Sequence, residues 1–173
     1  MQKTIIRFGL ISGIISSILM VIVSFIGKAV GFQTFADYGA YIGFTCIILS
    51  LTLVFVGIKN YRDQQNDGTI SFGKAFQIGI LITLISCVCY ALTWVVCYFN
   101  LFPTFFEDYS AYYLQKLQEG GASAAEIAKQ TAEMKRTNEL YQNPLYNFGI
   151  TFMEPFPVGL LMTVVAAWVL KKK

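Results

Sequence analysis

Three long stretches of the chain contain no charged side chain, and this pattern limits the fold more than any other feature of the sequence. They cover residues 8–26, 38–58 and 75–106, and a fourth stretch, 146–170, contains only Glu154. Only 13% of the residues are charged, against about 25% in a soluble domain. A helix needs about 20 mainly apolar residues to cross the roughly 30 Å hydrocarbon core of a bilayer. The sequence therefore predicts an all-α membrane protein, a bundle of four transmembrane helices.

The lengths of the uncharged stretches set the expected spans. We predict them at about residues 8–26, 38–58, 76–101 and 148–170, within a single membrane domain. The 32 residues of the third stretch would form a helix of about 48 Å, which is too long for a simple crossing. Pro103 lacks the amide hydrogen that continues a helix. The third span should therefore end shortly before it.

The polar segment at about 104–145 carries the signals of two helices. Four apolar side chains in its first half recur with the spacing of one helix face: Phe106, Tyr109, Tyr113 and Leu117. Gly120 and Gly121 end that helix, and Ser123 with Glu126 forms a capping box that begins the next one. We expect an extracytoplasmic helical hairpin between the third and fourth spans, resting on the membrane surface or on the bundle.

The other connections are short. Residues 27–37 predict a glycine-rich turn between the first two spans. Residues 57–74 form a polar connection in which Asp67-Gly68 is a turn signal and Ser71 is an N-cap for the third helix. In the first span, Gly9, Gly13 and Ser17 lie four residues apart on one face, which permits close helix approach. We expect this face to pack within the same molecule rather than in a dimer.

The basic residues predict the orientation, because short cytoplasmic segments carry an excess of Lys and Arg. One side of the membrane would hold both termini and the 57–74 connection, with eight basic residues: Lys3, Arg7, Lys59, Arg62, Lys74, Lys171, Lys172 and Lys173. The other side would hold five: Lys28, Lys116, Lys129, Lys135 and Arg136. Both termini should therefore lie in the cytoplasm.

The sequence carries no recognisable site for a metal, a cofactor or catalysis. It contains no His, and its four cysteines lie inside predicted spans, where they behave as small apolar residues: Cys46, Cys87, Cys89 and Cys97. No Ser or Cys stands near a base, and there is no glycine-rich phosphate loop. The net charge of +3 comes mostly from residues at the ends of apolar runs, which favours interfacial anchors over nucleic-acid binding. We expect neither enzyme activity nor a cofactor.

Several stretches of the chain together resemble a known family. They are 57–63 (GIKNYRD), 68–76 (GTISFGKAF), 103–109 (PTFFEDY), 151–159 (TFMEPFPVG) and the terminal Lys run. With these stretches the chain resembles the bacterial integral-membrane family called domain of unknown function 4199, over nearly its whole length. The resemblance implies a multi-pass protein of a bacterial cytoplasmic membrane and brings no activity with it.

Glu154 is the sharpest candidate for a functional residue. A carboxylate at the centre of a spanning helix costs roughly 2.5–3.5 kcal/mol on insertion scales, so such residues are usually functional. Pro155 and Pro157 beside it would disturb the helix and free carbonyl groups, which could create a cation or proton site. The alternative, which we favour, is a carboxylate near the interface that a Tyr, Asn or Thr satisfies by a hydrogen bond.

Arg62 and Asp63 are a second candidate pair, in the 57–74 connection. With Lys59 and Tyr61 they could form a docking surface for a cytoplasmic partner or for anionic lipid head groups. The simpler interpretation, which we favour, is an orientation-setting loop that contains a local ion pair. Exposed ion pairs contribute little to stability.

Two functions of different classes remain open at this point. The first is a structural or accessory envelope protein without catalysis of its own. The second is an oligomeric component of a transport or proton or cation pathway that uses the carboxylate of Glu154. In either case we expect bilayer lipids as partners, together with further copies of the chain or another membrane protein, and no nucleic acid.

The predicted orientation can be tested by cysteine labelling. Single cysteines at Gln65 and Gln130, in a background without the four native cysteines, place one thiol on each predicted side. An impermeant maleimide should label only the Gln130→Cys protein in intact cells, because the 57–74 connection should be cytoplasmic. Labelling of Gln65→Cys alone would mean that the orientation is the reverse.

Overall fold

The structure is a computed structural model that describes the backbone of residues 1–172 and their side chains, except those of Phe32, Thr34 and Ala36. This part of the chain is helical apart from short connections and one isolated β-bridge between Ile70 and Lys172. Its helices are α1 (Gln2–Val30), α2 (Phe32–Gln65), α3 (Phe72–Asn100), α4 (Phe105–Glu119), α5 (Ala124–Tyr141), α6 (Pro144–Met153) and α7 (Phe156–Leu170).

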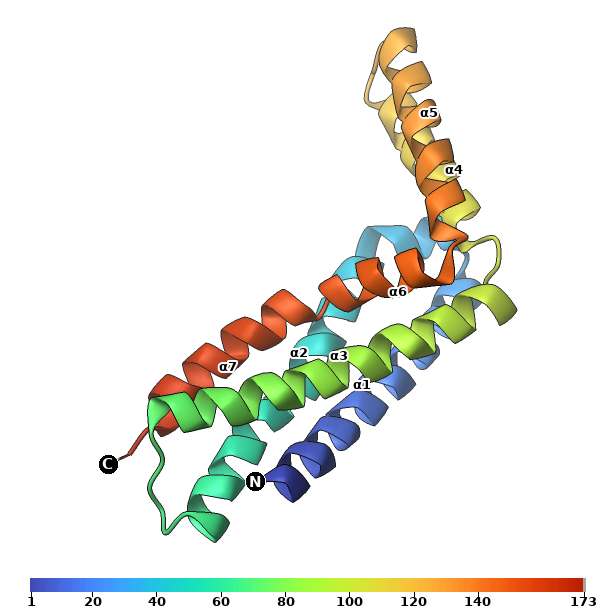
Figure 1. Ribbon diagram of the computed structural model, residues 1–173. Coiled ribbons are helices and arrows are strands. Elements are labelled where there is room, and N and C mark those ends of the chain that lie inside the picture. Colours follow the sequence, from blue (N-terminus) through green and yellow to red (C-terminus); the bar gives the residue numbers. More distant parts are fainter. Residues whose placement is uncertain (173) are drawn as a thin grey trace.

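Within the described residues, four helical segments are long and apolar enough to cross a membrane: α1, α2 from Asp37 onward, α3, and α6 with α7. This confirms the predicted all-α membrane fold with four spanning segments. Both termini and the α2–α3 connection lie at one end of the bundle, called here the terminal end (Figure 1). The α4–α5 hairpin projects from the opposite end, called here the hairpin end. Helices α1 and α7 each pack against both α2 and α3.

Small residues let the helix backbones approach closely. A Cβ atom on Gly13 would lie 2.6 Å from Cβ of Cys89, and one on Gly9 would lie 2.8 Å from Cβ of Ile85. The small-residue face of α1 therefore packs on α3 of the same molecule, as expected. Gly79 plays the same part between α3 and α7, because a Cβ there would lie 2.7 Å from Cγ2 of Thr163.

Buried hydroxyl groups join the same helices. Ser12 in α1 donates to the carbonyl of Ser50 in α2 at 2.8 Å and lies 3.0 Å from the hydroxyl of Ser86 in α3. The hydroxyls of Thr83 and Thr163 pair at 3.2 Å between α3 and α7. Such hydrogen bonds, each worth about 0.6 kcal/mol on average, hold membrane helices in register. The centre of the bundle is therefore held by both packing and polar contacts.

The turn expected at 27–37 is wrong, because a single residue, Gly31, separates α1 from α2. Gly31 has φ 87°, a backbone conformation that only glycine adopts without strain. Both helices continue well past the uncharged runs from which they were predicted. The apolar pattern marks the membrane core, whereas helical hydrogen bonds can extend beyond it into the interface.

The polar segment forms two helices, α4 and α5, which pack against each other as a hairpin. The side of the membrane that it faces stays a prediction. Gly121, with φ 79°, follows α4, and the hydroxyl of Ser123 caps α5 by accepting from the amide of Glu126 at 3.3 Å.

Helices α4 and α5 project away from the bundle (Figure 1), and they contact it at their base. The ring of Tyr141 lies 5.3 Å from that of Tyr98 in α3, and Gln33 at the start of α2 donates to Gln115 of α4 at 3.1 Å. Whether the hairpin rests on the membrane surface stays a prediction.

The fourth spanning segment is divided into two helices. Helix α6 ends at Met153 and α7 begins at Phe156, with Glu154 and Pro155 between them. Figure 1 shows this break part of the way along the bundle, between α6 and α7. Pro155 and Pro157 cannot donate the backbone hydrogen bonds that would make the two helices continuous. The break therefore lies where the sequence placed the proline pair.

Replacing Ser123 by Ala tests the hairpin. The change removes the only side-chain cap of α5 and should destabilise that helix locally by about 1 kcal/mol. Hydrogen exchange should become faster at the amides of the first turn of α5, while the amides of α3 keep their protection. An unchanged exchange pattern would mean that Ser123 does not begin the helix.

Candidate functional site

The break in the fourth span places Glu154 at the junction of two helices. Its amide donates to the carbonyl of Thr151 at 3.3 Å, which closes the last turn of α6. In a continuous helix Pro157 would donate to the carbonyl of Met153, but proline has no amide hydrogen. The phenol of Tyr90, from α3, donates to Oε2 of Glu154 at 3.3 Å. Glu154 thus has a tyrosine as its hydrogen-bond partner, as the alternative without a cation or proton site requires. Its side chain is also exposed.

The surface to which Glu154 is exposed is a cavity of about 680 Å³ in the hairpin half of the bundle. It lies between the second half of α1, the first half of α2, the end of α3, the base of the hairpin and α6. Helix α2 packs against α7 but makes no comparable contact with α6, so the bundle separates at this level. The wall is rich in aromatic side chains, including Phe35, Tyr90, Trp94, Phe102, Phe105 and Tyr141.

The cavity is closed toward the terminal end. Its lining ends at Ser16 on α1, Ile47 on α2 and Tyr90 on α3. One helical turn beyond these lie Ser12, Leu51 and Ser86, which are all buried, with exposed fractions of 0%, 1% and 3%. The hydrogen bonds that Ser12 makes to Ser50 and Ser86 join three helices at this depth. Packed side chains therefore form a floor, and the cavity is blind.

The deep end of the cavity contains polar atoms with few partners. Thr151 lines the cavity and is only 4% exposed, yet its hydroxyl has no hydrogen-bond partner in the described part of the chain. Among residues 1–172 the carboxylate of Glu154 takes part in no ion pair, and its hydrogen bond comes from Tyr90. The thiol of Cys46 is also part of the wall. This combination is suited to binding a ligand that donates hydrogen bonds or carries positive charge.

Charged residues surround the outer mouth of the cavity. Lys28, at the end of α1, has its Nζ 5.8 Å from the centroid of the Phe102 ring. Asp108, in the first turn of α4, also lines the mouth. Beside it, the phenol of Tyr112 donates to Asp37 at the start of α2, and this bond to a carboxylate raises the pKa of Tyr112. The hairpin is thus connected to α2 at the mouth of the cavity.

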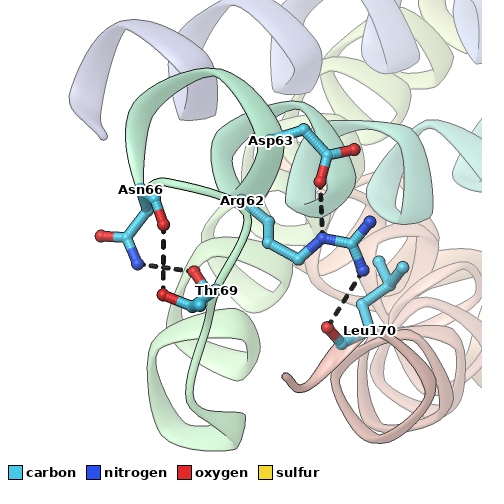
Figure 2. Close-up of polar contacts among 5 residues, drawn as sticks. All are labelled: Arg62, Asp63, Asn66, Thr69 and Leu170. Carbon is cyan, nitrogen blue, oxygen red and sulfur yellow. Dashed lines mark hydrogen bonds and ion pairs between the residues drawn. The ribbon is translucent and has the colours of Figure 1, made fainter. Parts of the chain in front are cut away.

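The second predicted pair, Arg62 and Asp63, lies at the terminal end, far from Glu154. Helix α7 separates the two sites over about 22 Å, from 15 residues at 1.5 Å each. Nε of Arg62 pairs with Oδ1 of Asp63 at 2.7 Å, and its NH1 donates to the carbonyl of Leu170 at 3.3 Å (Figure 2). The last carbonyls of a helix lack partners within it. Arg62 therefore caps the end of α7.

The same connection holds both chain termini. The amino group of Met1 donates to the side chain of Gln65 at 2.9 Å, and Gln65 donates to Thr4 at 2.6 Å. Ile70 and Lys172 exchange two backbone hydrogen bonds, each of 2.9 Å. In the turn between α2 and α3, the side chain of Asn66 donates to the carbonyl of Thr69 at 2.6 Å (Figure 2). These contacts favour a structural role for Arg62 and Asp63. The hollow beside Asp63 has a volume of about 220 Å³, against about 680 Å³ for the cavity at Glu154.

Several residues of the cavity carry no clear signal in the sequence. Tyr90 and Thr151 lie inside apolar runs and look like ordinary residues of a spanning helix. One signal was available for Thr151, which precedes Glu154 by three residues and so lies on the same side of a helix. Nothing in the sequence shows that Tyr90 faces Glu154, because that depends on how α3 and α6 are aligned. Within residues 1–172, no three side chains of Cys, Asp or Glu are grouped so that they could hold a metal ion.

The role of Arg62 can be separated from that of Asp63. Replacing Arg62 by Gln removes both the ion pair and the cap on α7, and it should lower the melting temperature of the detergent-solubilised protein. Replacing Asp63 by Asn removes the ion pair and keeps the bond from Arg62 to Leu170, so it should have a smaller effect. Equal losses in the two variants would mean that the cap on α7 contributes nothing.

Comparison with known proteins places the chain in one family. No curated protein and no solved structure matches it. The sequence model of the family described as "Protein of unknown function (DUF4199)" matches residues 7–172, nearly the whole chain. The chain belongs to this family, as its resemblance at 57–76 and 151–159 indicated.

Proposed function

We propose that this protein is a non-catalytic accessory protein of the membrane that binds a small lipid-soluble molecule in the cavity beside Glu154. The observation that carries the proposal is the blind cavity itself, with an aromatic wall and polar atoms at its deep end. Small-molecule sites typically have volumes of about 300–1,000 Å³ and mainly apolar walls with a few polar groups. A cavity of about 680 Å³ falls in this range. A purely structural protein would have no need to keep such a space open.

We also propose that the protein lies in a bacterial cytoplasmic membrane with both termini in the cytoplasm. The excess of basic residues in the short segments of the terminal end supports this orientation. The hairpin and the mouth of the cavity would then lie on the outer side. A ligand would reach Glu154 from the outer half of the bilayer or from the extracytoplasmic space.

A second candidate function is a proton or cation pathway that uses Glu154. A carboxylate at a broken helix is typical of such pathways. In this protein the pathway would have to continue through the floor, where Ser12, Leu51 and Ser86 are packed and buried. Transport would therefore require the helices to separate below Glu154, for example within an oligomer. Binding requires no such movement, and it is the function that the blind cavity favours.

Filling the cavity tests the binding proposal. Replacing Gly43 by Leu puts a side chain into the cavity, because Gly43 lines it and a Cβ there meets no atom within 4 Å. Replacing Gly149 by Leu is the matched control, since this exposed glycine of α6 also has nothing within 4 Å and lies outside the lining. Leu is preferred to Gly in helices, so neither change should destabilise the protein.

The measurement is mass spectrometry of the intact protein released from mild detergent after purification from membranes. The wild type and Gly149→Leu should retain a small bound molecule that Gly43→Leu lacks. Identical spectra for the three proteins, with or without bound molecules, would contradict the proposal.

A further inference from the structure

We propose that the ligand is an amphipathic organic cation, whose positively charged head lies against Glu154 and whose apolar body lies along the aromatic wall. This inference rests on the proposed binding function and specifies its ligand. It follows from the chemistry at the two ends of the cavity and from the composition of the wall between them.

The first step is the charge at the deep end. An ionised carboxylate has about four lone-pair sites for hydrogen bonds, and among the described residues a hydrogen bond to Glu154 comes only from Tyr90. A carboxylate within the span of a membrane protein normally pairs with another charged or polar group. Here no Lys or Arg of residues 1–172 lies within ion-pair distance of Glu154. A cationic ligand would supply the missing partner.

The second step is that the groups beside Glu154 can also accept. The hydroxyl of Thr151 has no hydrogen-bond partner among the described residues, and Pro157 removes the helical donor to the carbonyl of Met153. The phenol of Tyr90 already donates to Glu154, so its oxygen can accept as well. The donors at the deep end are neutral, such as the hydroxyl of Thr151 and the thiol of Cys46, so a ligand with a carboxylate or phosphate head would find no cationic partner there.

The third step is the aromatic wall. Ring faces attract ammonium and other organic cations within about 6 Å, and the attraction increases when water is excluded. The cavity already contains one such contact, since Nζ of Lys28 lies 5.8 Å from the centroid of the Phe102 ring. Tyr90 and Trp94 offer further rings one helical turn apart near the deep end. The wall therefore suits a cation with aromatic or other bulky apolar groups.

The position of Lys28 is compatible with a cationic ligand. On α1 it lies 12 residues beyond Ser16, or about 18 Å from the depth of the floor. Lys28 is exposed at the mouth, where Asp108 also lines the cavity. Over the whole lining the carboxylates of Asp108 and Glu154 outnumber the single ammonium of Lys28. Since Lys28 and Asp108 are at the mouth, Glu154 is the charged lining residue at the deep end.

The test compares two probes of similar shape, tetraphenylphosphonium, which is a cation, and triphenylphosphine oxide, which is neutral. Binding is followed by the fluorescence of Trp94 in protein solubilised in a neutral detergent, in a Trp168→Phe background. Trp168 is exposed on α7, outside the cavity lining, so this change leaves one tryptophan, in the wall. Comparing variants with the same probe cancels the partition of the probe into the micelle.

Replacing Glu154 by Gln keeps hydrogen-bonding capacity and removes the charge. It should weaken tetraphenylphosphonium binding by about tenfold or more, as expected for loss of a charged partner, and change triphenylphosphine oxide binding by less than about twofold. Glu139→Gln changes an exposed carboxylate of α5 outside the cavity lining, so it is the control and should change both affinities little. Gly43→Leu should abolish the binding of both probes. Melting temperatures verify that each variant is folded.

Two other results have distinct meanings. Suppose that Gly43→Leu abolishes binding, but Glu154→Gln lowers the affinity for both probes equally or changes neither affinity. The cation proposal is then wrong, while the cavity still binds ligands. If neither probe binds, or if Gly43→Leu leaves the binding of both probes unchanged, both proposals fail. If the Glu154→Gln protein does not fold, the Tyr90→Phe variant replaces it in the binding test. It frees an oxygen of the carboxylate, so tetraphenylphosphonium should bind at least as tightly, and weaker binding of the cation alone would overturn the proposal.

Discussion

The hydrocarbon core of a membrane supplies no hydrogen-bond partners, so a spanning helix can be broken only where protein or a cavity satisfies its free groups. The pair Pro155 and Pro157 imposes such a break between α6 and α7. At this break the phenol of Tyr90, from α3, donates to the carboxylate of Glu154, while the carbonyl of Met153 loses its helical donor. The cavity lies beside the break, and Glu154 lines it.

The two halves of the bundle differ in how their helices meet. Toward the terminal end, Gly9, Gly79 and Gly159 bring backbones together, and hydroxyl groups such as that of Ser12 bond across the contacts. Toward the hairpin end, a Cβ on Gly43 would meet no atom within 4 Å. Glycine therefore serves two purposes in the bundle: at Gly9 and Gly79 it allows close contact, and at Gly43 it leaves space. Spacing in the sequence alone does not distinguish these uses, because Gly39 and Gly43 lie four residues apart like Gly9 and Gly13.

Much of the fold could be predicted because it depends on local pattern. Uncharged runs mark the spans, Ser71 and Ser123 mark helix starts, and the prolines at 155 and 157 mark the break. What could not be predicted depends on several helices at once. The partner of Glu154, the depth of the floor and the direction of the hairpin follow from the rotation and alignment of α1, α2 and α3 against α6. The single-residue turn at Gly31 was missed for another reason: helices continue outside the membrane core, where the apolar pattern ends.

The separation between the two candidate sites limits what each can do. At the terminal end, Arg62 caps α7, Gln65 holds the first turn of α1, and Ile70 pairs with Lys172, so three connections fix the ends of the four spans to one another. At the hairpin end, beyond the floor, the contacts include aromatic rings at the hairpin base, such as Tyr98 with Tyr141, and the bond from Tyr112 to Asp37. A change in cavity volume on ligand binding would therefore move the hairpin end more than the terminal end. Because Asp37 and Tyr112 connect α2 to α4 at the cavity mouth, such a movement would be transmitted to the hairpin, the part of the molecule that projects farthest from the bundle.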